Sequence, residues 1–152
     1  MPFSTLALGW RTRQGGAAKA RLDYLDFVVD GSSLLDRLPP VGSVGVLGWM
    51  LPEYEADAVA QLLLRQPPEM PGGRVPLYVC PQCGDLGCGA VTAEIEETED
   101  AFVWSDLARE VNYHYEPGDD GILERYEGVG PFAFDAAEYR SVLNARLAQV
   151  AV

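Results

Sequence analysis

The sequence predicts an α+β protein: an antiparallel meander around residues 75–105, covered by two main helices at about 52–66 and 135–149. Two segments of helical length carry start signals, and the short alternating segments between them are typical of strands. Strands and helices that are segregated along a chain favour the α+β class. The 152 residues are enough for a single domain, 1–152, with its own hydrophobic core.

The N-terminal third predicts short elements. Scattered apolar residues in 1–9 suit a short strand, and the glycines of 14–18 indicate a link. Apolar and acidic residues alternate over 21–30, which predicts a second strand. Residues 34–38 predict a short helix, and 44–49 predict an apolar strand interrupted by glycines.

The clearest helix is expected at 52–66. Pro52 suits the first helical position, where a missing N–H costs nothing. Glu53 and Glu55 stand in the first turn, where the helix dipole favours negative charge. The residues expected to face the core are Ala56, Val59, Ala60 and Leu63.

Strand-like segments follow. The runs 75–79, 90–95 and 101–104 predict the meander; its first connection holds the cysteines, and its second is the acidic loop 96–100. Along the middle run, side chains should alternate between the core and water, with Thr92 on the side that faces water.

Residues 105–111 are expected to form a brief helix, and residues 122–131 carry no clear pattern.

The last helix, expected at about 135–149, has a clear start signal. Asp135 lies three residues before Glu138, which is the spacing of a capping box. The buried stripe of this helix is expected to be Tyr139, Val142, Leu143, Leu147 and Val150.

The net charge of −12 is unevenly spread. Residues 1–50 hold five basic and four acidic side chains, residues 51–100 hold two and ten, and residues 101–152 hold four and nine. An acidic field repels phosphate backbones, which disfavours nucleic-acid binding, and it accelerates the encounter with a basic protein. Acids that serve only solubility are the alternative interpretation.

The composition also indicates a compartment. Three cysteines do not make a disulfide framework, so we expect a reducing cytoplasm. No apolar run approaches the ~20 residues of a membrane helix. Residues 1–10 lack the pattern of a secretory signal. We therefore expect a cytoplasmic protein without membrane contact; its oligomeric state is not indicated.

All three cysteines lie in one glycine-rich turn, with the pattern C-x2-C-x4-C. Thiolates on tight turns suit zinc because backbone N–H groups there point at sulfur. The spacing resembles a zinc knuckle, whose fourth ligand would stand at Ala93, a residue that cannot bind metal. His114, the sole histidine, is the candidate to complete the set. The sequence thus predicts zinc held by Cys80, Cys83, Cys88 and His114.

Two other interpretations of the cysteines stay open. In the first, they are reduced thiols in a tight turn, and His114 is an ordinary loop residue. In the second, Cys80 and Cys83 form a C-x-x-C redox couple, with Cys88 as a resolving thiol. Redox motifs of this kind stand at a helix N-terminus, and the Gly-Asp-Leu-Gly that follows Cys83 is a poor helix start.

Residues 77–92 resemble the cysteine turn of a family of small uncharacterised bacterial proteins. These proteins share C-x-C-G or C-x-x-C-G followed by D-x-G-C-G, and then Val-Trp-Ser-Asp as at 103–106. Residues 130–135, with Tyr139, are similar to the family's C-terminal end. The likeness covers residues 74–148 and implies a shared fold. Some members carry an oxidoreductase label, but the resemblance implies no reaction, cofactor or catalytic residue.

We expect this protein to act by binding and not by catalysis, with the cysteine turn as a structural or zinc-supported knuckle. The excess of acids favours a basic protein as the partner, as for an inhibitor or an immunity protein. The alternative function is a thiol oxidoreductase that uses Cys80 and Cys83.

Overall fold

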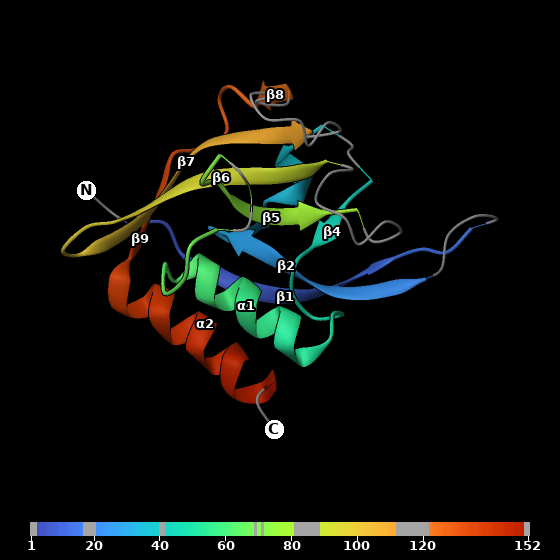
Figure 1. Ribbon diagram of the computed structural model, residues 1–152, viewed down its shortest axis with the longest axis horizontal. Helices are drawn as coiled ribbons and strands as arrows, with labels where there is room; N and C mark the ends of the chain where they lie inside the picture. Colours follow the sequence, from blue (N-terminus) through green and yellow to red (C-terminus); the bar gives the residue numbers. More distant parts are fainter. Residues whose placement is uncertain are drawn as a thin grey trace.

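Figure 1 shows the computed structural model, which describes residues 3–16, 21–39, 42–68, 70, 72–80, 89–111 and 122–150. The strands form a three-stranded and a six-stranded sheet, and the two α-helices lie side by side along one face of the molecule. The predicted α+β class is confirmed. No helix in the described ranges is long and apolar enough to cross a membrane.

The small sheet holds β1 (Leu6–Arg13), β2 (Leu22–Val29) and β3 (Ser32–Ser33), in that order. In the antiparallel register of β1 and β2, Trp10 is opposite Leu25, and Arg11 is opposite Tyr24. Successive side chains on a strand point to opposite faces. Trp10 and Leu25 therefore share one face of this strand pair, and Arg11 and Tyr24 share the other.

The large sheet contains the predicted meander. Its strand order is β4 (Val44–Gly45), β5 (Val75–Val79), β6 (Ala90–Glu97), β7 (Ala101–Val111) and β8 (Ile122–Arg125). β9 (Phe132–Asp135) also pairs with β7, beside the half that β8 leaves open. The acidic loop between β6 and β7 is the exposed turn that the sequence predicts.

Two strand predictions need correction. The helix expected at 105–111 is wrong, because this segment continues β7 and pairs with both β6 and β8. The register of β6 and β7 shifts between Thr92 and Glu94, and Asp106 takes a left-handed φ of 51° there, so β7 contains a bulge. Of the strand expected at 44–49, only Val44–Gly45 is paired as a strand, and Leu47 forms an isolated bridge with Leu25.

Thr92 is buried, although the alternation of β6 predicts that it faces water. Arg74 covers it: its Nε donates a hydrogen bond to Oγ1 of Thr92 at 2.8 Å. The same guanidinium donates to the carboxylate of Asp106 at 3.0 Å and to the carbonyl oxygen of Asp106. Arg74 thus spans from β6 to β7 over the bulge and satisfies polar groups that would otherwise be buried alone.

The helices are α1 (Pro52–Leu62) and α2 (Ala136–Val150), and a 3-10 turn, η1, spans Leu35–Arg37. α1 ends four residues before the predicted residue 66, because Leu64 adopts a left-handed φ of 57°. The N–H groups of Leu64 and Arg65 bond to the carbonyls of Gln61 and Ala60, which is a Schellman stop. The predicted cap of α2 is confirmed, since Asp135 accepts the N–H of Glu138 at 3.0 Å.

The buried faces of the helices differ in detail from the expectation. On α1, Val59 is buried as predicted, and so is Leu63 just after the helix, but the acid Glu55 is buried as well. On α2, Tyr139 and Leu143 are buried, and the other three residues of the predicted stripe are half-buried.

The core is centred on Trp104 of β7. Its ring meets Phe27, Phe134 and Tyr139 edge to face, with ring centroids 5.0–6.2 Å apart. Its Nε1 donates to the hydroxyl of Tyr139 at 3.1 Å, and that hydroxyl donates to the carbonyl of Leu62 at 2.6 Å. This chain of hydrogen bonds links the large sheet to α2 and then to α1.

Candidate functional site

The structure describes one of the four predicted zinc ligands. Cys80 directly follows β5, and its side chain is half-buried. Cys83, Cys88 and His114 lie outside the described residues. Within the described residues, no three histidine, cysteine, aspartate or glutamate side chains are grouped so that they could hold a metal ion. The zinc site and the thiol couple therefore stay predictions.

The strands that flank these segments end on the same side of the large sheet. Val79, at the end of β5, is opposite Ala90, at the start of β6. Ala90 is in turn opposite Glu110, near the end of β7. The chain thus leaves β5 toward Cys83 and leaves β7 toward His114 from one end of the sheet, as the predicted meander requires.

Large exposed apolar side chains lie on β1 and at the start of α1. Four large apolar side chains are exposed in the described part of the chain, and three of them are Trp10 (64% exposed), Leu51 (58%) and Tyr54 (57%). The fourth, Phe3, lies beyond the other end of β1. We call Trp10, Leu51, Tyr54 and the exposed Glu53 between the last two the Trp10 surface.

Trp10 is exposed but held in place. A Cβ built on Gly48 would lie 3.1 Å from Cζ3 of Trp10, so the indole packs closely against the backbone there. The guanidinium carbon of Arg146, from α2, lies 5.7 Å from the centre of a Trp10 ring, which is the geometry of a cation–π contact. Both contacts come from segments remote in sequence, so the fold itself fixes the ring.

Glu55 contacts both of the groups that hold Trp10, Arg146 and the backbone of Gly48. It pairs with Arg146 through two hydrogen bonds, at 2.5 and 3.2 Å, and it accepts the N–H of Gly48 at 2.8 Å. A cavity of about 350 Å³ lies beside Trp10, between β1 and α2. Its apolar lining comes mainly from Ala7, Leu8, Leu25, Val142 and Ala145. The sequence places Glu55 at the helix start but gives no signal that it is buried.

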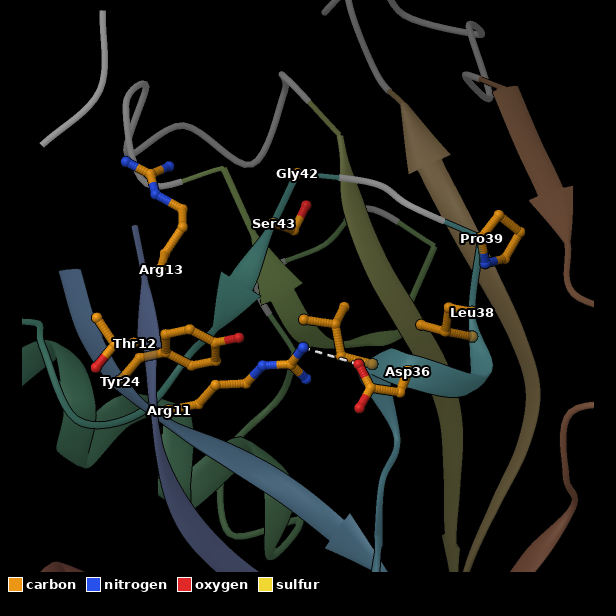
Figure 2. Close-up of a pocket in the computed structure, with 10 residues that line it drawn as sticks. Arg11, Thr12, Arg13, Tyr24, Asp36, Leu38, Pro39, Gly42 and Ser43 are labelled. Atoms are coloured by element: carbon orange, nitrogen blue, oxygen red, sulfur yellow. Dashed lines mark hydrogen bonds and ion pairs between the residues drawn. The ribbon is translucent and has the colours of Figure 1, made fainter. Parts of the chain in front are cut away.

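A second cavity opens on the other face of the β1–β2 strand pair (Figure 2). It measures about 460 Å³ and lies between these strands and residues of 35–39, with Gly42 and Ser43. Tyr24 is only 2% exposed, and Figure 2 shows its hydroxyl pointing into the cavity. Burial raises the pKa of Tyr24, and the nearby charge of Asp26 adds to this effect. The hydroxyl therefore stays protonated at neutral pH.

Arg11 forms part of the wall of this second cavity and is fixed from two sides. It donates to Asp36 at 2.8 Å, to Ser33 at 2.9 Å and to the buried Asp26 at 3.3 Å. The hydrogen bond to Asp36 raises the pKa of Arg11. Asp26 also accepts the hydroxyl hydrogen of Tyr78 at 2.6 Å, so the wall is anchored to the large sheet.

Comparison with known proteins gives no relative for this chain: no family model, no curated protein and no solved structure matches it. The resemblance of residues 74–148 to the bacterial family thus stays a prediction, and the functional argument depends on the surfaces described above.

Proposed function

We propose that this protein binds a basic protein partner through the Trp10 surface. The observation that carries the proposal is Trp10 itself, which is 64% exposed although Gly48 and Arg146 hold its ring. Exposed aromatic side chains that are already ordered lose little conformational entropy on binding, and tryptophan is enriched among the residues that dominate binding energy.

The charges around Trp10 favour a basic partner. Within Pro52–Leu62, α1 carries three acids and no base. Glu55 is matched by Arg146, whereas Glu53 is exposed and Asp57 is half-buried. A partner with lysine or arginine around an apolar side chain would complement this surface, and the net charge of −12 would accelerate the encounter.

The adjacent cavity gives the interaction a second anchor. Its volume of about 350 Å³ is enough for an apolar side chain of the partner, which would enter beside Trp10. We place this interaction in the cytoplasm, on the composition of the chain, and an inhibitor or immunity-type role would use a surface of this kind. The proposal does not depend on the cysteine turn, so zinc binding and thiol chemistry are separate questions.

Affinity capture from an extract of the native host tests this function. The full chain would serve as bait at low salt in three forms: wild type, Trp10→Ala and Phe3→Ala. Phe3 is the matched control, because it is an exposed aromatic residue outside the Trp10 surface. We expect a basic protein on the wild-type and Phe3→Ala baits, its loss from Trp10→Ala, and its release by added salt. Identical proteins on all three baits would contradict the proposal.

A further inference from the structure

We propose that the basic partner adds an extended segment as a new strand to the open edge of β1. Strand addition rests on the proposed function, because it is the way in which the partner would engage the Trp10 surface. β1 is the outer strand of the small sheet, whose order is β1-β2-β3 (Figure 1). Among the described strands, its eight residues, Leu6–Arg13, pair with β2 alone.

The hydrogen bonds of the β1–β2 ladder determine which backbone groups of β1 face outward. The N–H of Asp30 donates to the carbonyl of Thr5 at 3.0 Å, so these two residues form a hydrogen-bonded pair at the end of the ladder. In an antiparallel ladder such pairs recur at every second residue. Leu8 and Trp10 lie three and five residues after Thr5 in an unbroken register, so their N–H and carbonyl groups point away from β2.

The chain itself places a strand against this edge, next to the start of β1. The N–H of Ser4 donates to the carbonyl of Ala133 at 2.8 Å, and Ser4 forms a parallel bridge with Phe134 of β9. Ser4 is an even number of residues before Leu8 and Trp10, so all three N–H groups point to the same side. β9 ends just after this bridge, where α2 begins. No other segment of the described chain forms a hydrogen bond with the outward groups of Leu8 and Trp10.

β1 lacks the features that usually prevent an edge strand from pairing with another chain. Edge strands are commonly protected by short length, proline, charged side chains or a bulge. The other strands at sheet edges in the described part of the chain, β3, β4, β8 and β9, are two to four residues long. β1 is eight residues long, keeps a regular register with β2, and has no proline or charge over residues 6–10. Its edge is therefore a template for an added strand.

The cavity beside Trp10 selects apolar side chains on one face of the added strand. It lies between β1 and α2, and Ala7, Leu8 and Trp10 of β1 all line it. Its only charged lining residue is Arg146, whose charge is matched by Glu55. A strand added along Leu8 and Trp10 would direct every second side chain toward this cavity, as the alternation of a strand requires.

The other side chains of the added strand would point to water, where the charge of the protein favours lysine or arginine. The net charge of −12 attracts a basic segment. The same charge disfavours a second copy of this chain as the occupant, because two chains that each carry −12 repel one another. We therefore expect the partner to offer an extended segment in which basic and apolar residues alternate.

Calorimetric titration of the full chain with synthetic peptides tests strand addition. Each probe has seven residues, in which lysine alternates with valine, with leucine or with phenylalanine. Two control versions of each probe carry N-methyl groups on the odd or on the even residues, so each version lacks the N–H donors of one edge. We expect at least one probe to bind saturably. One of its methylated versions should bind about tenfold more weakly or worse, and the other should stay close to the unmodified peptide, because an added strand pairs through one edge only.

Amide hydrogen exchange, followed by NMR for each residue, locates the bound peptide. In the free protein, the amides of Leu8 and Trp10 should exchange faster than those of Ala7 and Gly9, which point to β2. The bound peptide should slow exchange at Leu8 and Trp10 at least tenfold and change Ala7 and Gly9 much less. The difference between neighbouring residues is the signature of strand pairing, since burial alone would protect both sets.

Three results would overturn strand addition: no saturable binding of any probe, equal binding of the two methylated versions, or unchanged exchange at Leu8 and Trp10 in the complex. The same titrations separate this inference from the proposed function. Loss of peptide binding in Trp10→Ala, with equal binding of both methylated versions to wild type, would keep the Trp10 surface and exclude strand addition. Unchanged peptide binding in Trp10→Ala, with exchange still slowed at Leu8, would keep strand addition and contradict the Trp10 surface.

Discussion

Glu55 and Arg146 form a two-point ion pair between the first turn of α1 and the last turns of α2, although they are 91 residues apart in the sequence. The carboxylate is buried, and the guanidinium is mostly buried. Because Arg146 also lies against Trp10, this pair joins the packing of the two helices to the orientation of the exposed indole.

Replacing Glu55 with alanine should lower the free energy of unfolding by about 3 kcal/mol, because it leaves Arg146 and the N–H of Gly48 without their partner. Denaturant titration measures this loss. Glu53→Ala is the control: Glu53 lies two residues before Glu55 and is exposed, so the loss of stability should be within about 0.5 kcal/mol. If Glu55→Ala lowered the free energy of unfolding no more than Glu53→Ala does, the ion pair would contribute nothing to stability.

Arg74→Ala should cost about 3 kcal/mol, because it leaves Thr92 and Asp106 with unpaired polar atoms at the bulge. Arg125 also binds Asp106, at 3.0 Å, but its side chain is 58% exposed, so Arg125→Ala should cost less than about 1 kcal/mol. Denaturation midpoints of the two variants give the comparison. If Arg125→Ala lowered the stability more than Arg74→Ala, Arg74 would not be the residue that stabilises the bulge.

Tyr139→Phe should lower the free energy of unfolding by about 2 kcal/mol. The change keeps the ring but leaves the indole N–H of Trp104 and the carbonyl of Leu62 without the hydroxyl that they share. Tyr54→Phe, at an exposed position, should have no measurable effect on stability. An unaltered melting temperature in Tyr139→Phe would mean that this hydrogen-bond chain does not stabilise the core.

Alkaline pH should unfold the protein through its buried tyrosines. Burial raises the pKa of both Tyr78 and Tyr139 above the ordinary value of 10.0. A group whose pKa is raised in the folded state stabilises that state fully below its unfolded pKa, and this contribution is lost as the pH rises further. Phenolate absorbance and circular dichroism, recorded together, should show these two residues ionising only as the chain unfolds. Ionisation of all seven tyrosines near pH 10 in a folded chain would contradict this account.

The structure does not describe Cys83, Cys88 and His114, so the predicted zinc site is tested by metal analysis of the purified protein. If the prediction holds, protein purified without chelator carries about one zinc ion per chain, and Cys80→Ser lowers this content. Metal analysis and thiol titration measure the two quantities. Protein with only traces of zinc and three freely titrating thiols would leave the cysteines as ordinary thiols or as a redox couple.

The elements that the sequence predicts well are those with strong local signals. Pro52 and Asp135 mark helix starts, and the alternation of β6 marks the middle of the meander. The misplaced elements are those decided by distant partners. Residues 105–111 extend β7 because β6 and β8 lie on either side, and no local pattern shows these neighbours.

The candidate sites were harder to predict for the same reason. Asp26 and Glu55 are acids in alternating or helical patterns that suggest exposure, yet each is buried by arginines or hydroxyls from other elements. The exposure of Trp10 has no sequence signal either, since an apolar residue in a strand is usually taken as core.

The affinity of the purified basic partner for wild-type protein, Trp10→Ala and Phe3→Ala tests the central claim most directly. The account predicts that Trp10→Ala weakens binding by about thirtyfold or more, as expected for a residue that dominates an interface, while Phe3→Ala stays close to wild type. Equal affinities for all three forms, measured at the same low salt, would contradict it.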